Sequence, residues 1–222
     1  MASMLITPSL RSATNALRRS TGASLNFGAS NLKRAHISIN QTQKCVASTS
    51  YSDEEYRPNV GICIVNSQGL VFSAQRCDDV QNTWQMPQGG IDEGEDPAVA
   101  ALREVEEETS ISSARIVGEL DQWLTYDFPT LVRQRLHGGW QKYKGQKQKW
   151  FLVYFYGDDS EINIVTKEQE FKQWKWMKIE ELPESVIPFK KDVYVVVAQQ
   201  FAPMIKKLKE SGDLSVKAAL PT

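Results

Sequence analysis

The feature that most constrains this chain is a run of glutamates near the middle of the sequence. Glu104, Glu107 and Glu108 are three and four residues apart, so on an α-helix their side chains share one face. Each like-charged pair at such spacing costs about 0.2–0.5 kcal/mol on an exposed helix. A divalent cation bound between the carboxylates would remove this repulsion. The run therefore predicts a helix with an acidic face that can bind metal.

The residues around the glutamates predict where this helix begins and which side it buries. Asp96 suits the N-cap, and Pro97 suits the first helical position. The helix should end near Thr109 or Ser110. Apolar residues recur at helical spacing and predict a buried stripe opposite the acidic face; they are Ala98, Ala101, Leu102 and Val105.

The composition restricts the kind of metal site. The chain has two histidines, His36 and His137, and three cysteines without metal-ligand spacing, so a metal must be held by oxygen, as Mg²⁺ or Mn²⁺ prefers. A solvated acidic surface is the simpler alternative. The surroundings favour a site, because Arg103 can orient carboxylates and the Gly89–Gly90 pair allows close approach of a ligand.

The first fifty residues have a different character from the rest. No Asp or Glu occurs before Asp53, whereas Ser, Thr, Ala and Arg are frequent. A basic, Ser-rich and acid-poor start is typical of an organelle transit peptide, and here it favours the chloroplast, with the mitochondrion as the alternative. A disordered basic arm that binds nucleic acid or membrane is the competing interpretation. We expect a disordered transit peptide over 1–50, one domain over 51–210 and a flexible tail over 211–222.

The body alternates strands with two helices. Apolar and β-branched runs predict a hairpin over 59–74, and further strands are expected over 84–87, 116–125, 149–156 and 171–178. A second helix is expected over about 192–210. This order predicts an α/β fold in which a mixed sheet is sandwiched between helices. No run approaches the ~18 apolar residues of a membrane span.

The acidic segment resembles the Nudix box. That motif is a Gly, five residues, a Glu, seven residues, and then Arg-Glu-apolar-x-Glu-Glu-x-Gly-apolar. The matching positions start at Gly89 and Glu95 and continue through Arg103 to Ile111. Ser110 replaces the last Gly, which puts the local turn in doubt rather than the chemistry.

The resemblance extends over about residues 56–205 to one branch of the Nudix family. The branch contains the plant asymmetric diadenosine tetraphosphate hydrolases and the bacterial RNA 5′-pyrophosphohydrolases. Its segments here include YRPNVGI, WQMPQGGIDEGED, WLTYDFP, GQKQKWFL, EFKQWKW and FKKDVY. The resemblance implies a Nudix α/β/α sandwich with a mixed sheet.

The resemblance also implies roles for individual residues. Glu104, Glu107, Glu108 and Glu170 would bind metal. Catalytic roles would fall to Glu104, Glu107, Arg103 and Glu170, with the identity of the general base left open. Positions suited to phosphates and bases are Arg57, Arg76, Tyr126, Gln148, Lys149, Phe189 and Lys190.

The expected activity is hydrolysis of a phosphoanhydride bond that depends on Mg²⁺ or Mn²⁺. The transit peptide favours a dinucleoside polyphosphate, with diadenosine tetraphosphate cleaved asymmetrically to ATP and AMP. The GQKQKW segment favours instead the removal of pyrophosphate from triphosphorylated RNA, and guanosine alarmones remain candidates. A catalytically silent nucleotide-binding module is the alternative from another class. The expected partner is a small nucleotide, or RNA 5′ ends, with no membrane or DNA, and the sequence leaves the oligomeric state open.

Overall fold

The computed structural model describes residues 55–215. The predicted transit peptide over 1–50 lies outside this range. The predicted tail is described only as far as Ser215, and in that part Leu214 is buried. Within the described range, none of the helices combines the length and apolar character of a membrane span.

The fold is built on a mixed sheet of seven strands in the order β4-β6-β1-β2-β7, with β3 paired to β1 and β5 paired to β6. At its centre, β1 (Tyr56–Val65) and β6 (Gly145–Phe155) run parallel along their shared length. The other pairings of β1, β2 and β6 are antiparallel, and their strands are β2 (Val71–Arg76), β3 (Gln88–Gly90), β4 (Ala114–Glu119), β5 (Leu124–Asp127) and β7 (Phe171–Met177).

The sheet is split between β1 and β2. These strands pair at Val65 and Val71, next to the turn that joins them, and then diverge. The segment that leads into β3 fills the gap. It makes a bridge from Gln85 to Ala74 of β2, and the Pro87 carbonyl accepts a hydrogen bond from the Ile62 amide of β1 at 2.9 Å. Side chains on the two faces of the sheet can therefore approach each other at this split.

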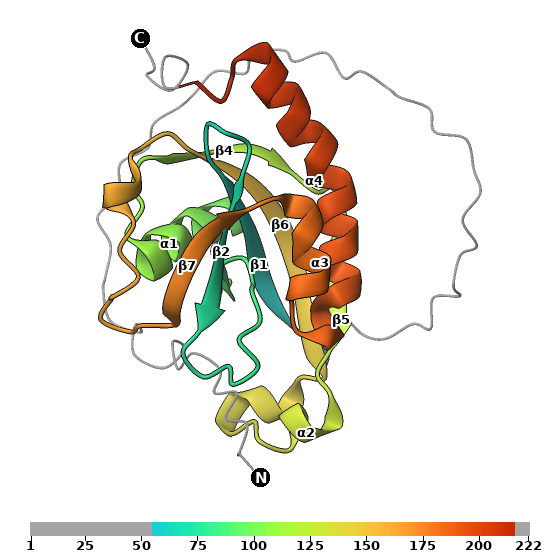
Figure 1. The fold of residues 1–222 in the computed structure, drawn as a ribbon. Coiled ribbons are helices and arrows are strands. Elements are labelled where there is room, and N and C mark those ends of the chain that lie inside the picture. The colour runs from blue at the N-terminus through green and yellow to red at the C-terminus, as the bar shows by residue number, and fades with distance from the viewer. Residues whose placement is uncertain (1–54, 216–222) are drawn as a thin grey trace, which may run out of the picture. The chain divides into compact units, whose positions relative to one another are not determined.

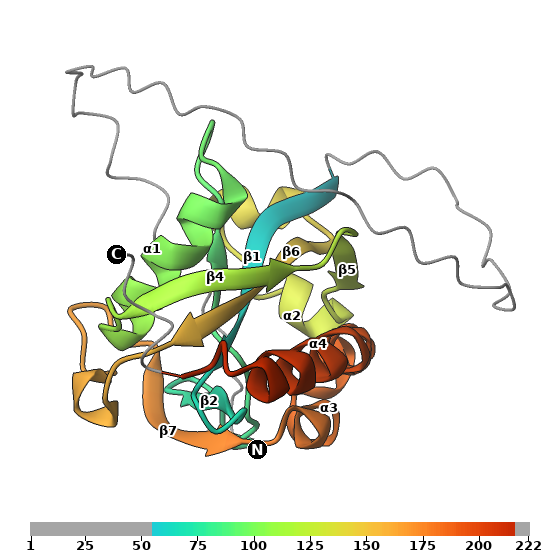
Figure 2. The same cartoon turned by 90° about the horizontal axis from the view of Figure 1, so that it is seen from above.

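Helices cover both faces of the sheet (Figures 1 and 2). The helix α1 (Pro97–Thr109) packs its alanines and Val105 against Val60, Ile62 and Ile64 of β1. The helix α4 (Lys191–Ser211), with α3 (Leu182–Ser185), covers the other face, where Trp150 of β6 meets Tyr194 edge to face. The predicted α/β sandwich with a mixed sheet is confirmed.

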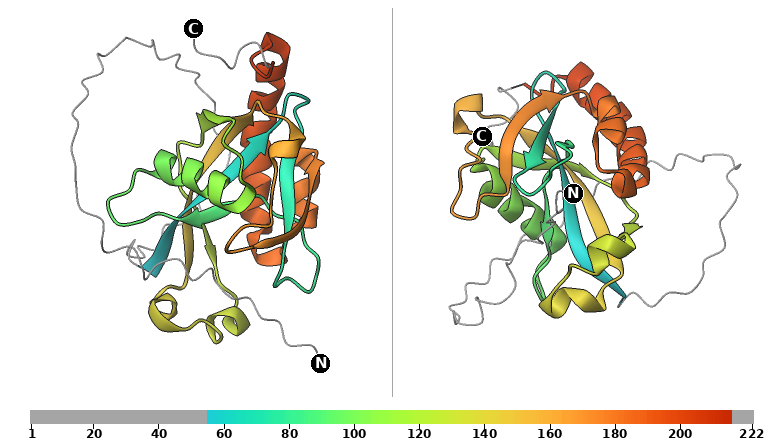
Figure 3. Two further views of the ribbon diagram at one scale, coloured as in Figure 1. Left: turned by 90° about the vertical axis from the view of Figure 1, so that its left-hand side faces the viewer. Right: turned by 60° about the horizontal axis from the view of Figure 1, so that its bottom comes forward.

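A basic excursion leaves the sheet after β5 and returns at the start of β6; we use this name for residues 129–147, of which 145–147 belong to β6. It contains α2 (Thr130–Arg133) and η2 (Gly138–Lys142) and extends past the ends of β1 and β6 (Figure 3). Leu136 is buried and anchors it. The remaining short turns are η3 (Asp159–Glu161), η4 (Ile179–Glu181) and η5 (Pro188–Lys190).

The structure corrects two predicted strands. The strand expected over 116–125 is two strands, β4 and β5, which pair with different parts of β6. The strand expected over 84–87 makes a bridge at Gln85, and the continuous strand comes later, as β3. Both errors arise because partners distant in sequence decide where a short strand forms.

The face that α1 buries also differs from the prediction. Leu102, expected in the buried stripe, is 39% exposed, whereas Glu104 and Glu108 are only 6% and 4% exposed. Ala100, Ala101 and Val105 form the apolar contact. The helix is thus rotated so that two carboxylates face the split in the sheet.

Ser110 is the C-cap of α1, at the position where the resemblance places a glycine. Its φ of 61° and ψ of 9° lie in the left-handed region, which is unfavourable for a residue with a Cβ. The Ser110 hydroxyl donates a hydrogen bond to the Asn163 carbonyl at 3.0 Å. This contact offsets part of the conformational cost.

We expect Ser110→Gly to raise the free energy of unfolding by about 0.5 kcal/mol, because relief of the left-handed strain exceeds the loss of one exposed hydrogen bond. Ser110→Ala is the matched control, because it keeps the strain and removes the bond, and it should lower stability by about 0.5 kcal/mol. Urea denaturation measures both. Equal changes in the two variants would contradict the role of backbone strain.

Candidate functional site

Arg103 organises the carboxylates at the exposed edge of α1. Its Nε and Nη2 donate to both oxygens of Glu95 at 2.8 and 2.9 Å, and Nη2 also donates to the Gly90 carbonyl at 2.8 Å. Nη1 donates to Glu104 at 2.7 Å and to Glu107 at 3.2 Å. One guanidinium therefore ties the loop before the helix to two glutamates on it. The hydrogen bonds from Arg103 lower the pKa of Glu95.

The glycine pair of β3 lies directly against charged side chains. A Cβ added at Gly89 would lie 1.8 Å from Glu104 Cδ, and one added at Gly90 would lie 2.1 Å from Arg57 Nη2. Successive residues of a strand point to opposite faces. The pair thus leaves room for a carboxylate on one side of the sheet and a guanidinium on the other.

Glu108 lies deeper, beside an ion-paired group. Arg76, at the end of β2, donates from Nη1 to Glu170 at 2.7 Å and from Nε to Asp78 at 2.8 Å. Burial raises the pKa of Glu108 well above its usual value, and the negative charges of Glu170 and Glu104 raise it further, whereas Arg76 opposes them. Burial alone would lower the pKa of Arg76, but Glu170 and Asp78 outweigh it, so Arg76 stays charged.

The arrangement provides oxygen ligands but does not enclose an ion. Within residues 55–215, no three Asp, Glu, His or Cys side chains are placed so that they could hold a metal. The physical reason is that Arg103 and Arg76 occupy oxygens of Glu104, Glu107 and Glu170.

One buried carboxylate oxygen nevertheless fits a metal. Among the described residues, Glu108 Oε2 is fully buried and has no hydrogen-bond partner, a costly state for a carboxylate. Glu170 and Glu104 lie close enough for their charges to raise the pKa of Glu108. A hard divalent cation suits an all-oxygen set of this kind.

The other face of the split carries buried amides. Gln148 Nε2 donates to Asn59 Oδ1 at 2.7 Å and to Gln88 Oε1 at 3.2 Å. Gln85 and Gln148 are at most 5% exposed, and within the described residues Gln85 Nε2 and Gln148 Oε1 have no hydrogen-bond partner. The group thus offers one donor and one acceptor to a polar ligand.

Lys190 and two aromatic rings complete this face. Lys190 Nζ donates to Gln88 at 3.0 Å and to Gln85 at 3.2 Å, and it lies 5.6 Å from the centre of the Tyr126 ring. The Tyr126 and Phe189 rings are 5.7 Å apart. Burial lowers the pKa of Lys190 to about 7, and the positive charge of Arg76 acts in the same direction. Lys190 and Arg76 are therefore close across the split.

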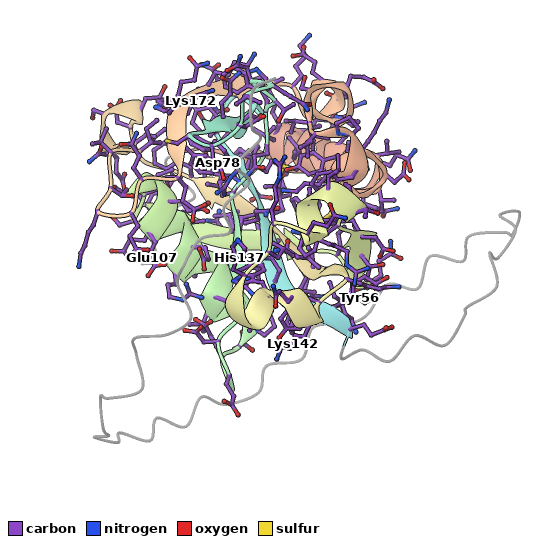
Figure 4. The ribbon with its side chains drawn as sticks, turned by 90° about the horizontal axis from the view of Figure 1, so that it is seen from below. Tyr56, Asp78, Glu107, His137, Lys142 and Lys172 are labelled. Atoms are coloured by element: carbon purple, nitrogen blue, oxygen red, sulfur yellow. The ribbon has the colours of Figure 1, made fainter. Side chains whose placement is uncertain are left out.

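Arg57 joins the two halves of the site to the basic excursion. Its guanidinium lies over the Trp140 ring, 4.1 Å from the centroid. Burial lowers the pKa of Arg57, and the charge of Glu104 opposes this effect. In the view from below, His137 and Lys142 of the excursion lie between Glu107 and Tyr56 (Figure 4).

Of the site residues predicted from the sequence, Lys149 is the one whose side-chain contacts lie away from the others. Lys149 Nζ donates to the Leu120 carbonyl at 2.5 Å and lies 3.4 Å from Glu119. It is next to Gln148 in β6 and therefore faces away from the buried amides, on the side of the sheet that α1 covers, where it contacts β4 and the residue after it. The other predicted site residues cluster around the split, on α1, on the strand ends or at η5; they are Glu104, Glu107, Glu108, Glu170, Arg103, Arg57, Arg76, Tyr126, Gln148, Phe189 and Lys190.

Several residues at the site were missed in the sequence. Asn59, Gln85 and Gln88 are polar residues within or beside apolar strands, and this contrast is a signal that could have identified them. Asp78 and Trp140 carry no such signal, because only the fold brings them to Arg76 and Arg57.

The lowered pKa of Lys190 predicts a pH-dependent stability. Between pH 7 and about 10.4, the ordinary lysine value, the unfolded chain binds more protons than the folded one, so stability rises with pH. The cost of burying the charge is fully present below pH 7. From pH 7 to 9, Lys190 should add about 2 kcal/mol to the free energy of unfolding.

Urea denaturation at pH 7 and pH 9 tests this expectation by comparing the unchanged protein with Lys190→Met, which should lose the increase. Lys191→Met, at the partly exposed neighbouring position, should retain it. An equal increase in the protein and in Lys190→Met would show that Lys190 keeps an ordinary pKa.

Comparison with known proteins agrees with this geometry. The model of the NUDIX domain matches residues 55–197. Nudix hydrolase 26 of Arabidopsis thaliana, described as chloroplastic, is 48% identical over 163 residues, which cover 72% of this chain and 75% of that protein. An RNA pyrophosphohydrolase of Roseobacter denitrificans is 50% identical over 148 residues, which cover 66% of this chain and 91% of that protein.

A third relative, Nudix hydrolase 25 of Arabidopsis thaliana, is 48% identical over 151 residues, covering 66% of this chain and 86% of that protein. The matched family region contains α1, the split in the sheet and both halves of the site. The extent of these matches shows that the chain belongs to the Nudix family of hydrolases.

Proposed function

We propose that this chain hydrolyses a phosphoanhydride bond in a dinucleoside polyphosphate, and that it cleaves diadenosine tetraphosphate asymmetrically to ATP and AMP. The observation that carries the proposal is the buried Glu108, with its unpartnered oxygen beside Glu104 and Glu170. Basic and aromatic side chains lie across the split from this carboxylate. Such a pairing suits a phosphate chain with a base at its end.

We propose that Mg²⁺ or Mn²⁺ is held by Glu104, Glu107, Glu108 and Glu170. Such an ion would neutralise charge on the leaving phosphate and make a bound water more acidic. For the ion to enter, Glu104 and Glu107 must turn from Arg103, and Glu170 from Arg76. Arg103 would still be held by both oxygens of Glu95, next to the glutamates that it releases. The two arginines would thus keep the carboxylates in place when no ion is bound.

The proton from the attacking water requires a nearby base. A carboxylate whose pKa is raised towards neutrality accepts a proton more readily than an ordinary one. Burial and neighbouring charge raise the pKa of Glu108, and Glu170 lies beside it. We assign acceptance of the proton to one carboxylate of this group, with Glu104, Glu107 and Glu170 as the predicted catalytic carboxylates and Glu108 beside them.

We assign substrate binding to the other side of the split. Arg57 and Lys190 would neutralise phosphates there, and Arg76 would do so from the carboxylate side. Tyr126 and Phe189 would contact a base through their rings. Gln148 and the neighbouring amides would bind polar atoms of the substrate. Lys149 is also predicted to bind substrate; in the structure its Nζ contacts the Leu120 carbonyl and Glu119.

A second candidate is the removal of pyrophosphate from the 5′ end of triphosphorylated RNA. The observation in its favour is that the RNA pyrophosphohydrolase of Roseobacter denitrificans matches over 91% of its length. Both substrates present a base, a ribose and a phosphate chain, so the same site suits either. Guanosine alarmones share this chemistry.

We propose that residues 1–50 direct the chain to the chloroplast. The support is the acid-free, Ser-rich composition of that segment and the word chloroplastic in the names of two relatives, Nudix hydrolases 26 and 27 of Arabidopsis thaliana.

The function is tested by comparing kcat/KM for diadenosine tetraphosphate, triphosphorylated RNA, a guanosine tetraphosphate and ATP, with Mg²⁺ or Mn²⁺. We expect the dinucleotide to have the highest value, with ATP and AMP as products identified by chromatography. Chelation should abolish turnover. A higher value for RNA would favour the second candidate.

Glu107→Gln is the control for the site. We expect it to lower kcat by at least ~100-fold while circular dichroism shows an intact fold, because a ligand charge is lost and Glu107 is 34% exposed at its side chain. Near-normal turnover would contradict a role of Glu107, and with it the proposed metal site on α1, in the reaction. Failure of the unchanged protein on every substrate would favour a silent nucleotide-binding module.

Gly89→Ala provides a separate test of the carboxylate geometry. The added Cβ would overlap Glu104 Cδ at 1.8 Å, so the side chain must move. We expect kcat/KM to fall by about 100-fold, the size of loss produced by small displacements of catalytic groups. Gly139→Ala is the matched control, since no atom lies within 4 Å of its added Cβ, and it should keep full activity. Equal activity in both variants would contradict the importance of the Glu104 position.

A further inference from the structure

The basic excursion is one-sided in charge. Residues 129–147 contain no Asp or Glu and include Arg133, Arg135, Lys142, Lys144 and Lys147. The first three of these are exposed. Because the chain as a whole has a net charge of -1, this surface is a local concentration of positive charge rather than a property of the whole protein.

Aromatic rings alternate with these cations. Lys144 lies 4.7 Å from the centre of the Tyr56 ring, Lys142 lies 4.8 Å from that of Tyr143, and Lys147 lies 5.4 Å from that of Trp123. Trp123 is 38% exposed despite its size. Rings and cations placed side by side are the usual combination in surfaces that bind single-stranded nucleic acid, where rings stack on bases and cations contact phosphates.

The surface is continuous with the candidate active site. Tyr56 is opposite Gly145 and Arg57 is opposite Gln146 in the parallel pairing of β1 with β6. Trp140 of the excursion lies under Arg57, and Arg57 is close enough to Glu104 for that charge to affect its pKa. A chain that leaves the carboxylates past Arg57 therefore meets the excursion next.

We propose that the basic excursion, with Tyr56 and Trp123, binds the single-stranded RNA chain behind a 5′ phosphate group held in the site. This inference rests on the proposed nucleotide site and extends it to a polymeric substrate. A dinucleoside tetraphosphate is too short to need such a surface. Residues 129–147 contain five cations and no acid, and this excess of positive charge favours a polyanion. Asp127 lies at the edge of the surface, where it accepts a hydrogen bond from Tyr56 at 2.8 Å and lies 3.9 Å from Lys144, so the exposed Arg133, Arg135 and Lys142 carry the attraction. The exposed ring of Trp123 favours a polyanion with unpaired bases.

The test measures binding of a 12-nucleotide single-stranded RNA with a 5′ triphosphate to the full chain, by fluorescence anisotropy with no divalent ion. The variant is Arg133→Gln/Arg135→Gln/Lys142→Gln, which removes three exposed charges. The matched control is Lys178→Gln/Lys206→Gln/Lys207→Gln, three exposed lysines on or beside η4 and α4. Lys206 and Lys207 belong to the C-terminal part of α4, and the C-terminal end of that helix points away from α2 in Figure 1.

We expect the excursion variant to bind the RNA at least ~10-fold more weakly than the control. The slope of log affinity against log salt should fall by about 2, since each phosphate contact to a single strand contributes about 0.7. Trp123→Ala should weaken binding by about 5-fold or more, the lower end of the loss expected for one stacked base. A triphosphorylated dinucleotide should bind both triple variants equally.

Equal affinity of the 12-mer for the two triple variants would overturn the proposal, as would equal affinity of the unchanged chain for the 12-mer and the dinucleotide. Turnover of diadenosine tetraphosphate should be the same in both triple variants. Because RNA binding is measured without hydrolysis, a failure of the RNA-binding surface changes the affinity, whereas a failure of the proposed activity changes only turnover. If the protein bound the 12-mer more tightly than the dinucleotide but hydrolysed no substrate, the proposed function would be refuted and the proposed RNA-binding surface would stand.

Discussion

The arrangement of this protein's site depends on the burial of carboxylates that repel one another. Glu104 and Glu108 are almost fully buried, and the negative charges of Glu104 and Glu170 raise the pKa of Glu108. Charged groups removed from water are costly unless they are paired. Arg103 and Arg76 supply the pairing, one on the helix and one at the end of β2. Glu108 Oε2 is left without a partner, so the compensation is incomplete until something else binds.

The split between β1 and β2 makes this arrangement possible. A continuous sheet would separate α1 from the opposite face by a full layer of backbone. Here the segment from Gln85 to Gly90 fills the gap, and its glycines admit Glu104 from one side and Arg57 from the other. The charges of Arg76 and Glu108 therefore act on Lys190, although Lys190 belongs to the helix layer on the other face. The acidic and basic halves of the site therefore meet at the split in the sheet.

The excursion between β5 and β6 adds the outer part of the site. It is anchored by Leu136 and contacts Arg57 through Trp140. Arg57 is thus close both to Glu104 of α1 and to the basic, aromatic surface of the excursion. In the proposed function, Arg57 would connect the reacting phosphates to the part of the substrate that follows them.

Much of the fold was predictable, because α1 and α4 carry strong helical signals and β6 and β7 carry strong apolar or alternating ones. The strands 114–119 and 124–127 were merged in the prediction, since only pairing with different parts of β6 separates them. The buried face of α1 was predicted only in part, since Ala101 and Val105 are buried as expected but Leu102 is exposed. Periodicity favoured Leu102, whereas the sheet accepts Glu104, which pairs with Arg103 of the same helix, and Glu108, on which the charge of Arg76 from β2 acts.

The sequence by itself determined the spacing of the glutamates, the helix that presents them and the family pattern around Gly89 and Arg103, because these are local properties of a short segment. Only the tertiary structure decided which groups face these glutamates. Asp78, Gln85, Trp140 and Lys190 reach the site from strands and turns far apart in the chain. Their contacts follow from how the sheet splits and how the layers pack, and no local pattern encodes that.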